Sequence, residues 1–132
     1  MLDKTYTSIT KGIRVSVDVT YQENYSKPRQ NEFVFSYHVR IANEGEYAVK
    51  LLRRQWNIFD SDGRNIIVNG EGVVGKQPII APGQSYEYVS GCQLNSELGR
   101  MKGIYVMEKI HNGILLEIRI PAFELMVPYR MN

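Results

Sequence analysis

Alternation of apolar and polar residues is the main pattern along this chain of 132 residues. Residues 13–22, IRVSVDVTYQ, place a valine or tyrosine at every second position, with polar residues between them. Residues 32–43, EFVFSYHVRIAN, repeat the pattern with two phenylalanines, a tyrosine, a valine and an isoleucine. Because successive side chains point to opposite faces of a strand, both segments predict β-strands with one buried face. Nowhere does an apolar stripe of helical period persist long enough to predict a substantial helix.

A third strand is predicted over residues 47–60, YAVKLLRRQWNIFD, but its alternation slips where Leu51 and Leu52 are adjacent. One extra residue in a strand shifts the alternation in this way, so we predict a β-bulge near residues 51–54. Beyond the bulge, Trp56 and Ile58 are predicted to face the core.

Turn signals separate the remaining strands. Asp-Gly in residues 60–64, Pro-Gly in residues 81–84 and HNG in residues 111–113 each predict a tight turn. Seven to eight short antiparallel strands joined by such turns predict an all-β sandwich. We expect a single domain over residues 1–132, with its core over about residues 13–125.

Three glycines in NGEGVVGKQP, residues 69–78, match the G-x-G-x-x-G spacing of a dinucleotide-binding loop. That loop requires a following helix, whose N-terminus holds the pyrophosphate. Residues 73–83, VVGKQPIIAPG, contain two prolines and a turn instead, so the dinucleotide hypothesis is rejected. Gly70, Gly72 and Gly75 are interpreted as letting a long loop cross the end of the sandwich. The alternative is a backbone nest that holds an anion with help from Lys76.

A basic cluster precedes the tryptophan, and it has two interpretations. Lys50, Arg53 and Arg54 either form a solvated strand edge, or the two arginines join the glycine loop in an anion-binding patch. The nine tyrosines belong by default to the core, although tyrosine is also frequent in protein interfaces. The candidate partner surface consists of Trp56, Glu71, Gln77, Tyr86 and Tyr88.

The composition narrows the classes of function. A net charge of +2 provides no broad field for nucleic acid, and no stretch approaches the ~20 apolar residues of a membrane span. A single cysteine and the lack of a signal-peptide pattern favour a cytoplasmic protein. Cys92, His38 and His111 lie too far apart for metal-ligand spacing, and GQSYE lacks the second glycine of a nucleophile elbow. We therefore predict no catalytic residues, no metal site and no cofactor.

The segment GEGVVGKQPIIAPGQSYEYVSGCQL, with LLRRQW before it and GRMKGIYVM and IRIPAFEL after it, resembles the ApaG family. The resemblance extends from about Ile13 to Leu125. It implies a fibronectin type III-like or immunoglobulin-like sandwich and a bacterial protein linked to cobalt resistance and magnesium efflux. Related domains resemble protein-binding modules, and the family's glycine motif has been proposed to contact pyrophosphate.

The leading hypothesis is a non-enzymatic β-sandwich, a monomer or weak homodimer, that binds an unidentified protein partner through a sheet edge or the glycine-loop face. The alternative is a sensor of phosphate, pyrophosphate or a nucleotide that uses the loop from Gly70 to Gly75, supported by Lys76 and the arginines. A direct role in ion transport is disfavoured because no membrane segment is predicted.

Overall fold

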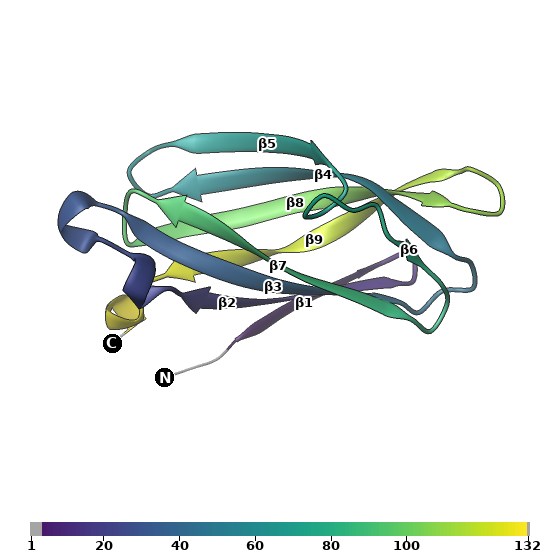
Figure 1. Cartoon of the computed structure of the whole chain (residues 1–132), viewed down its shortest axis with the longest axis horizontal. Coiled ribbons are helices and arrows are strands. Elements are labelled where there is room, and N and C mark those ends of the chain that lie inside the picture. The colour runs from purple at the N-terminus through teal and green to yellow at the C-terminus, as the bar shows by residue number, and fades with distance from the viewer. Residues whose placement is uncertain (1–3, 132) are drawn as a thin grey trace.

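Two antiparallel sheets pack face to face in the computed structural model, which describes residues 4–131 (Figure 1). One sheet has the strand order β1-β2-β3-β7, and the other has the order β5-β4-β8-β9 with β6 also paired to β4. The strands are β1 (Thr5–Thr10), β2 (Ile13–Tyr21), β3 (Phe33–Asn43), β4 (Val49–Asp60), β5 (Asn65–Glu71), β6 (Ile79–Ile80), β7 (Ser85–Leu94), β8 (Leu98–Lys109) and β9 (Leu115–Met126). Three short 3₁₀ helices complete the described chain: η1 (Glu23–Tyr25), η2 (Pro28–Gln30) and η3 (Pro128–Met131).

The all-β prediction is confirmed, with two strands that the sequence did not indicate. Those strands are β1 and the two-residue β6, which raise the count from seven or eight to nine within the described residues. The buried core also continues past the predicted limit, since Val127 is fully buried.

The predicted bulge is confirmed, because the register of β4 against β8 shifts between Leu51 and Arg53. Leu52 is therefore the extra residue. The shift lets the inward face of β4 change from odd to even positions, so that Leu51 and Trp56 both reach the core. Ile58 also packs against the core, as predicted.

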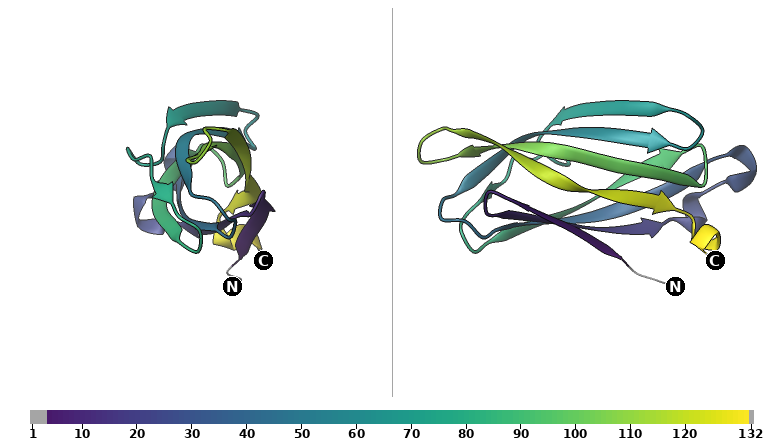
Figure 2. Two further views of the ribbon diagram at one scale, coloured as in Figure 1. Left: turned by 90° about the vertical axis from the view of Figure 1, so that its right-hand side faces the viewer. Right: turned by 180° about the vertical axis from the view of Figure 1, so that it is seen from behind.

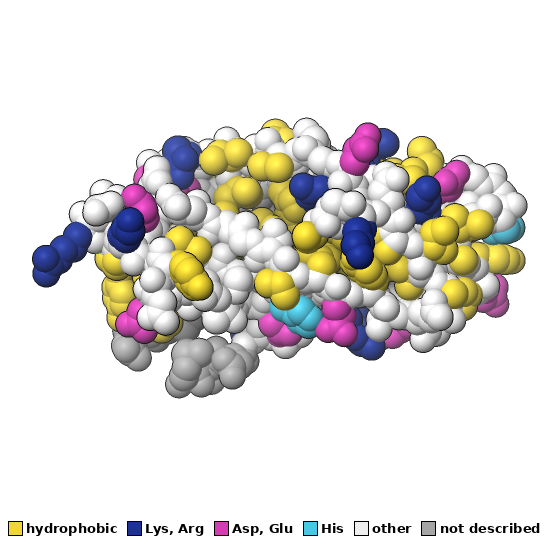
Figure 3. Space-filling view, viewed as in Figure 1, with side chains coloured by type: hydrophobic (Ala, Val, Ile, Leu, Met, Phe, Trp, Pro, Cys, Tyr) yellow, Lys and Arg dark blue, Asp and Glu magenta, His cyan; other side chains and the backbone are white. Residues whose placement is uncertain are grey.

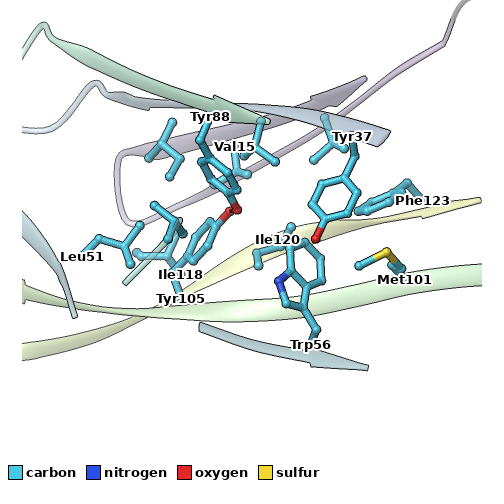
Figure 4. Close-up of a cluster of buried hydrophobic side chains, with 14 of the residues drawn as sticks. Val15, Tyr37, Leu51, Trp56, Tyr88, Met101, Tyr105, Ile118, Ile120 and Phe123 are labelled. Carbon is cyan, nitrogen blue, oxygen red and sulfur yellow. Dashed lines mark hydrogen bonds between the residues drawn. The ribbon is translucent and has the colours of Figure 1, made fainter. Parts of the chain in front are cut away.

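Side chains from both sheets interlock in one core (Figure 4). Tyr37 packs edge-on against Trp56 with ring centroids 5.5 Å apart, and Trp56 packs edge-on against Phe123 at 5.9 Å. Farther along, the hydroxyl groups of Tyr88 and Tyr105 meet in a hydrogen bond that joins the two sheets. These three rings and this hydroxyl pair span the space between the two sheets.

The two lateral sides of the sandwich differ. On one side β1 lies beside β9 (Figure 2), where Ser8 donates to the Arg119 carbonyl at 2.8 Å and the Arg119 N–H donates to Thr10 at 3.2 Å. On the other side β5 and β7 end their sheets, and residues 72–84 cross from one sheet to the other. This second, open side contains the glycine loop.

Candidate functional site

The glycine loop interrupts the edge of a sheet, between β5 and β6, which both pair with β4. Its tip is a tight turn in which the Val73 N–H donates to the Lys76 carbonyl at 2.8 Å and the Lys76 N–H donates back at 3.0 Å. The two central residues, Val74 and Gly75, have φ of 46° and 75°, as in a type I′ turn. No helix follows the loop, since the next element is β6. The rejection of a dinucleotide fold at this position is confirmed.

Each of the three glycines meets a different backbone or packing need. Gly72 has φ of 58°, and a Cβ there would lie 2.0 Å from the Lys76 carbonyl oxygen. A Cβ on Gly70 would lie 2.7 Å from the guanidinium carbon of Arg54. Gly75 has open space around it and needs only its positive φ. The loop conformation thus accounts for the spacing that resembles a phosphate-binding motif.

The bulge in β4 and the glycine loop hold each other in place. The Leu52 carbonyl accepts hydrogen bonds from the Gly72 N–H and from the Gln77 side-chain amide, both at 2.8 Å. The Leu51 N–H donates to the Pro78 carbonyl at 3.0 Å. Gln77, which the sequence assigned to the partner surface, is therefore engaged in bracing the loop.

The structure separates the two arginines of the basic cluster. Arg54 shares the inward face with Trp56, and its Nη1 donates to the carbonyls of Glu71 at 3.1 Å and Gly72 at 2.8 Å. Arg53 points to the outer face of the sheet and is exposed. The loop thus has one arginine against it, and the exposed Lys76 lies at its tip.

Two residues of the candidate partner surface were assigned wrongly. Trp56 is 3% exposed and Tyr88 is 8% exposed, so both belong to the core and cannot contact a partner. Alternation places both on inward faces, and burial of the Tyr88 hydroxyl beside Tyr105 raises its pKa. Of the others, Tyr86 is half-buried against the core, while Glu71 is exposed.

The free edge of β5 is a feature that the sequence pattern did not predict. The Gly72 N–H donates to the Leu52 carbonyl, and hydrogen-bonded pairs alternate along an antiparallel ladder. The odd-numbered residues of β5 therefore direct their N–H groups away from β4, into the open side. The only available signal was the pair of adjacent isoleucines after an Asp-Gly turn, Ile66 and Ile67, which are 38% and 61% exposed.

Reactive side chains elsewhere are engaged or distant from the loop. His38 lies on the polar outer face of β3, as predicted, with its Nε2 2.7 Å from a Glu87 oxygen. Burial raises the pKa of the Cys92 thiol to about 11. Within residues 4–131 no three His, Cys, Asp or Glu side chains gather to hold a metal ion. No helix in that range has the length and apolar character to cross a bilayer.

Fold and site together define a class: an antiparallel β-sandwich with one closed side, one open side and a braced glycine loop in the open edge. The ApaG domain family matches residues 23–109. The chain is 46% identical to Protein ApaG of Brucella abortus over 123 residues, which is 93% of this chain and 94% of that protein. The chain therefore belongs to the ApaG family.

Solved structures agree with this assignment. The crystal structure of an ApaA protein from Bordetella pertussis is 42% identical and superposes with a TM-score of 0.85, over 88% of this chain and 94% of that one. A second X-ray structure, 40% identical, has a TM-score of 0.82 and covers 89% and 88% of the two chains.

Proposed function

We propose that this chain is a non-enzymatic binding module that docks a protein partner by strand addition to β5. The observation that carries the proposal is the unpaired edge of β5 (Asn65–Glu71), which offers alternate N–H groups to the open side. An extended peptide gains main-chain hydrogen bonds at such an edge, while neighbouring side chains select its sequence.

Most of the β5 edge lacks the side chains that protect edge strands from pairing, which are charged residues and proline. Its sequence NIIVNGE contains no lysine, arginine or proline, and its one charged residue, Glu71, lies at the end that joins the glycine loop. Hydrophobic side chains gather between β5 and β7, with Lys and Arg side chains beside them (Figure 3). Exposed Ile67 and the half-buried Val68 provide apolar contact on the two faces of this edge. A partner strand would therefore cover apolar surface as well as satisfy backbone groups.

Site-directed photocrosslinking in the host tests this proposal. A photoreactive amino acid at Ile67, 61% exposed on β5, is expected to capture a specific partner. The same amino acid at Ile9, 53% exposed on β1, provides the matched control and should capture none. Specific capture from both positions, or from neither, would contradict docking at β5.

Backbone substitution gives a second test. Asn69 directs its N–H outward, so Asn69→Pro removes a donor for the partner and leaves the ladder to β4 in place. Asn69→Ala keeps the donor and is the control. We expect capture at Ile67 to be lost in the proline variant and retained in the alanine variant.

A second candidate function is an anion sensor at the glycine loop, with Lys76 and Arg54 as its cations. Two observations favour it. The Arg54 guanidinium donates hydrogen bonds to backbone carbonyls of the glycine loop, and among residues 4–131 it forms no ion pair with a carboxylate. Calorimetric titration with pyrophosphate, ATP and diadenosine polyphosphates tests it. Lys76→Ala should remove the heat, and Lys11→Ala, in another turn with positive φ, should not. Absence of heat at millimolar ligand would refute the sensor.

The family resemblance implies a link to cobalt resistance and magnesium efflux. We propose that this link is indirect and acts through the docked partner in the cytoplasm. The Asn69→Pro and Asn69→Ala variants separate this from a direct role. If the effect is indirect, cobalt tolerance of the host changes with the proline variant alone.

A further inference from the structure

A hollow of about 380 Å³ lies on the outer face of the sheet that contains β5. Its lining comes from three neighbouring strands: Asn57 and Phe59 from β4, Asn65 from β5, and Arg100 and Lys102 from β8. Strand register accounts for the grouping, since Phe59 lies between Asn65 and Arg100, and Asn57 lies opposite Lys102. The hollow is separate from the glycine loop, which lies beyond the other end of β5.

The polar side chains that line the hollow have no partner among the residues that the structure describes. Neither Arg100 nor Lys102 forms an ion pair or a side-chain hydrogen bond among residues 4–131, and both are exposed. The side-chain amides of Asn57 and Asn65 are likewise without a hydrogen bond in that range. Two cations and two amides thus surround the ring of Phe59, which is 45% exposed. Such a set of donors is complementary to a carboxylate carried on an apolar stem.

The shape and the surroundings favour a protein segment over the alternatives. A small ligand is normally enclosed on most of its surface, whereas this hollow lies on an open sheet face. A single-stranded nucleic acid needs several stacking rings along a basic groove, and Phe59 is the one aromatic residue that lines the hollow. Asn65 belongs both to the hollow and to the free edge of β5, so a chain paired with that edge passes directly beside the hollow.

We infer that the hollow binds carboxylate side chains of an extended acidic segment in the docked partner. This inference rests on the proposed docking function and specifies the chemistry of the partner. Neighbouring strands lie about 4.8 Å apart, so a strand added to β5 lies three strand spacings from Arg100 and Lys102 on β8. A glutamate in the part of the segment that leaves β5 at Asn65 and crosses the outer face of β4 meets both cations, and its methylene groups pack on Phe59.

Fluorescence anisotropy tests the inference with a labelled peptide in which glutamate and threonine alternate. We expect this peptide to bind about tenfold more tightly than its glutamine-threonine counterpart, and more weakly at about 0.2 M salt than at low salt. The double variant Arg100→Gln, Lys102→Gln should weaken binding about tenfold. The double variant Lys27→Gln, Arg29→Gln removes the same charge from exposed positions at the start of η2 and within it, and should leave binding unchanged.

Each contrary outcome has a distinct meaning. Absence of binding by the glutamate peptide, or equal loss in both double variants, overturns the acidic-segment inference and leaves docking at β5 to the photocrosslinking test. Binding that depends on Arg100 and Lys102 while Ile67 captures nothing supports the hollow and rejects strand addition. Tighter binding of oligothymidylate than of the glutamate peptide identifies a nucleic-acid site and overturns the inference.

Discussion

Asp60 is a buried carboxylate whose removal should destabilise the fold strongly. It ends β4, is 1% exposed, and accepts hydrogen bonds from two turns. The donors are the Arg64 guanidinium at 2.8 Å, the Asn95 N–H at 2.6 Å, the Asp62 N–H at 3.3 Å and the Ser96 hydroxyl. Asp60 thus joins the β4–β5 turn, within one sheet, to the β7–β8 turn, which connects the two sheets.

Asp60→Asn keeps the shape of the side chain but removes its charge and turns one acceptor oxygen into a donor. A hydrogen bond to a charged group contributes about 1.5–3 kcal/mol, and the amide group faces donors that need an acceptor. We therefore expect a loss of about 3 kcal/mol in the free energy of unfolding. For a domain of this size that corresponds to a fall of about 10 °C in Tm.

The effect should depend on pH in a defined direction. Burial alone would raise the pKa of Asp60, but the hydrogen bonds from Ser96, Asn95 and Arg64 outweigh it and lower the pKa below its ordinary value. The carboxylate therefore contributes its full stability above pH of about 4, and the contribution is lost as the pH falls through the lower pKa of the folded state. The difference in unfolding free energy between the wild type and Asp60→Asn should therefore shrink as the pH falls below about 4.

Urea denaturation followed by tryptophan fluorescence measures the loss of unfolding free energy and its dependence on pH, since Trp56 is the single tryptophan. Asp62→Asn makes the same chemical change at a more exposed neighbour and should cost less than about 1 kcal/mol. Equal losses of unfolding free energy in the two variants would refute the proposed role of the Asp60 carboxylate in joining the two turns. A loss for Asp60→Asn that persists unchanged at low pH would refute it as well.

Three further predictions concern the loop and the core. Gly72→Ala should lower the free energy of unfolding by about 3 kcal/mol or more, because its Cβ would overlap a backbone carbonyl. Gly75→Ala, whose Cβ meets open space, should lower it by about 1 kcal/mol, and thermal melts of the two variants measure the difference. Val74→Gly should raise the free energy of unfolding by about 0.5–1 kcal/mol, since valine is strained at φ of 46°. A Tm equal to or lower than that of the wild type would contradict this prediction. Tyr88→Phe or Tyr105→Phe leaves one buried hydroxyl without its partner and should lower the free energy of unfolding by about 1–3 kcal/mol. The double variant should recover part of this loss, because neither hydroxyl is then left unpaired. If chemical denaturation shows that the two single losses simply add, the coupling between the hydroxyls is refuted.

Sequence alternation predicted the long strands because it depends only on the backbone of each strand. Val15 and Val17, at alternate positions in β2, are fully buried, as the pattern indicated. The bulge was predictable for the same reason, since the doublet of Leu51 and Leu52 breaks a period of two. β1 and β6 were not predicted, because their sequences TYTSIT and II show no alternation of apolar and polar residues between two faces.

The candidate site was predictable only in part. The glycine spacing identified the loop, and proline placement excluded a helix after it. The choice of Trp56 and Tyr88 as partner residues failed because residue type does not distinguish a core ring from an interface ring. Asp60 lies at the start of the predicted Asp-Gly turn of residues 60–64, and its burial between two distant turns was not visible in the local sequence.

By itself the sequence determined which faces are apolar, where the chain turns and where one strand carries an extra residue. These properties follow from the two-residue period of a strand and from the φ preferences of glycine and proline. Only the tertiary structure decided that β5 is an edge, that Arg54 closes on the glycine loop, and that Arg100 and Lys102 share a hollow with Phe59. The physical reason is that strand order and register are set by pairing between segments far apart in the chain, and no local pattern encodes which strand is left without a neighbour.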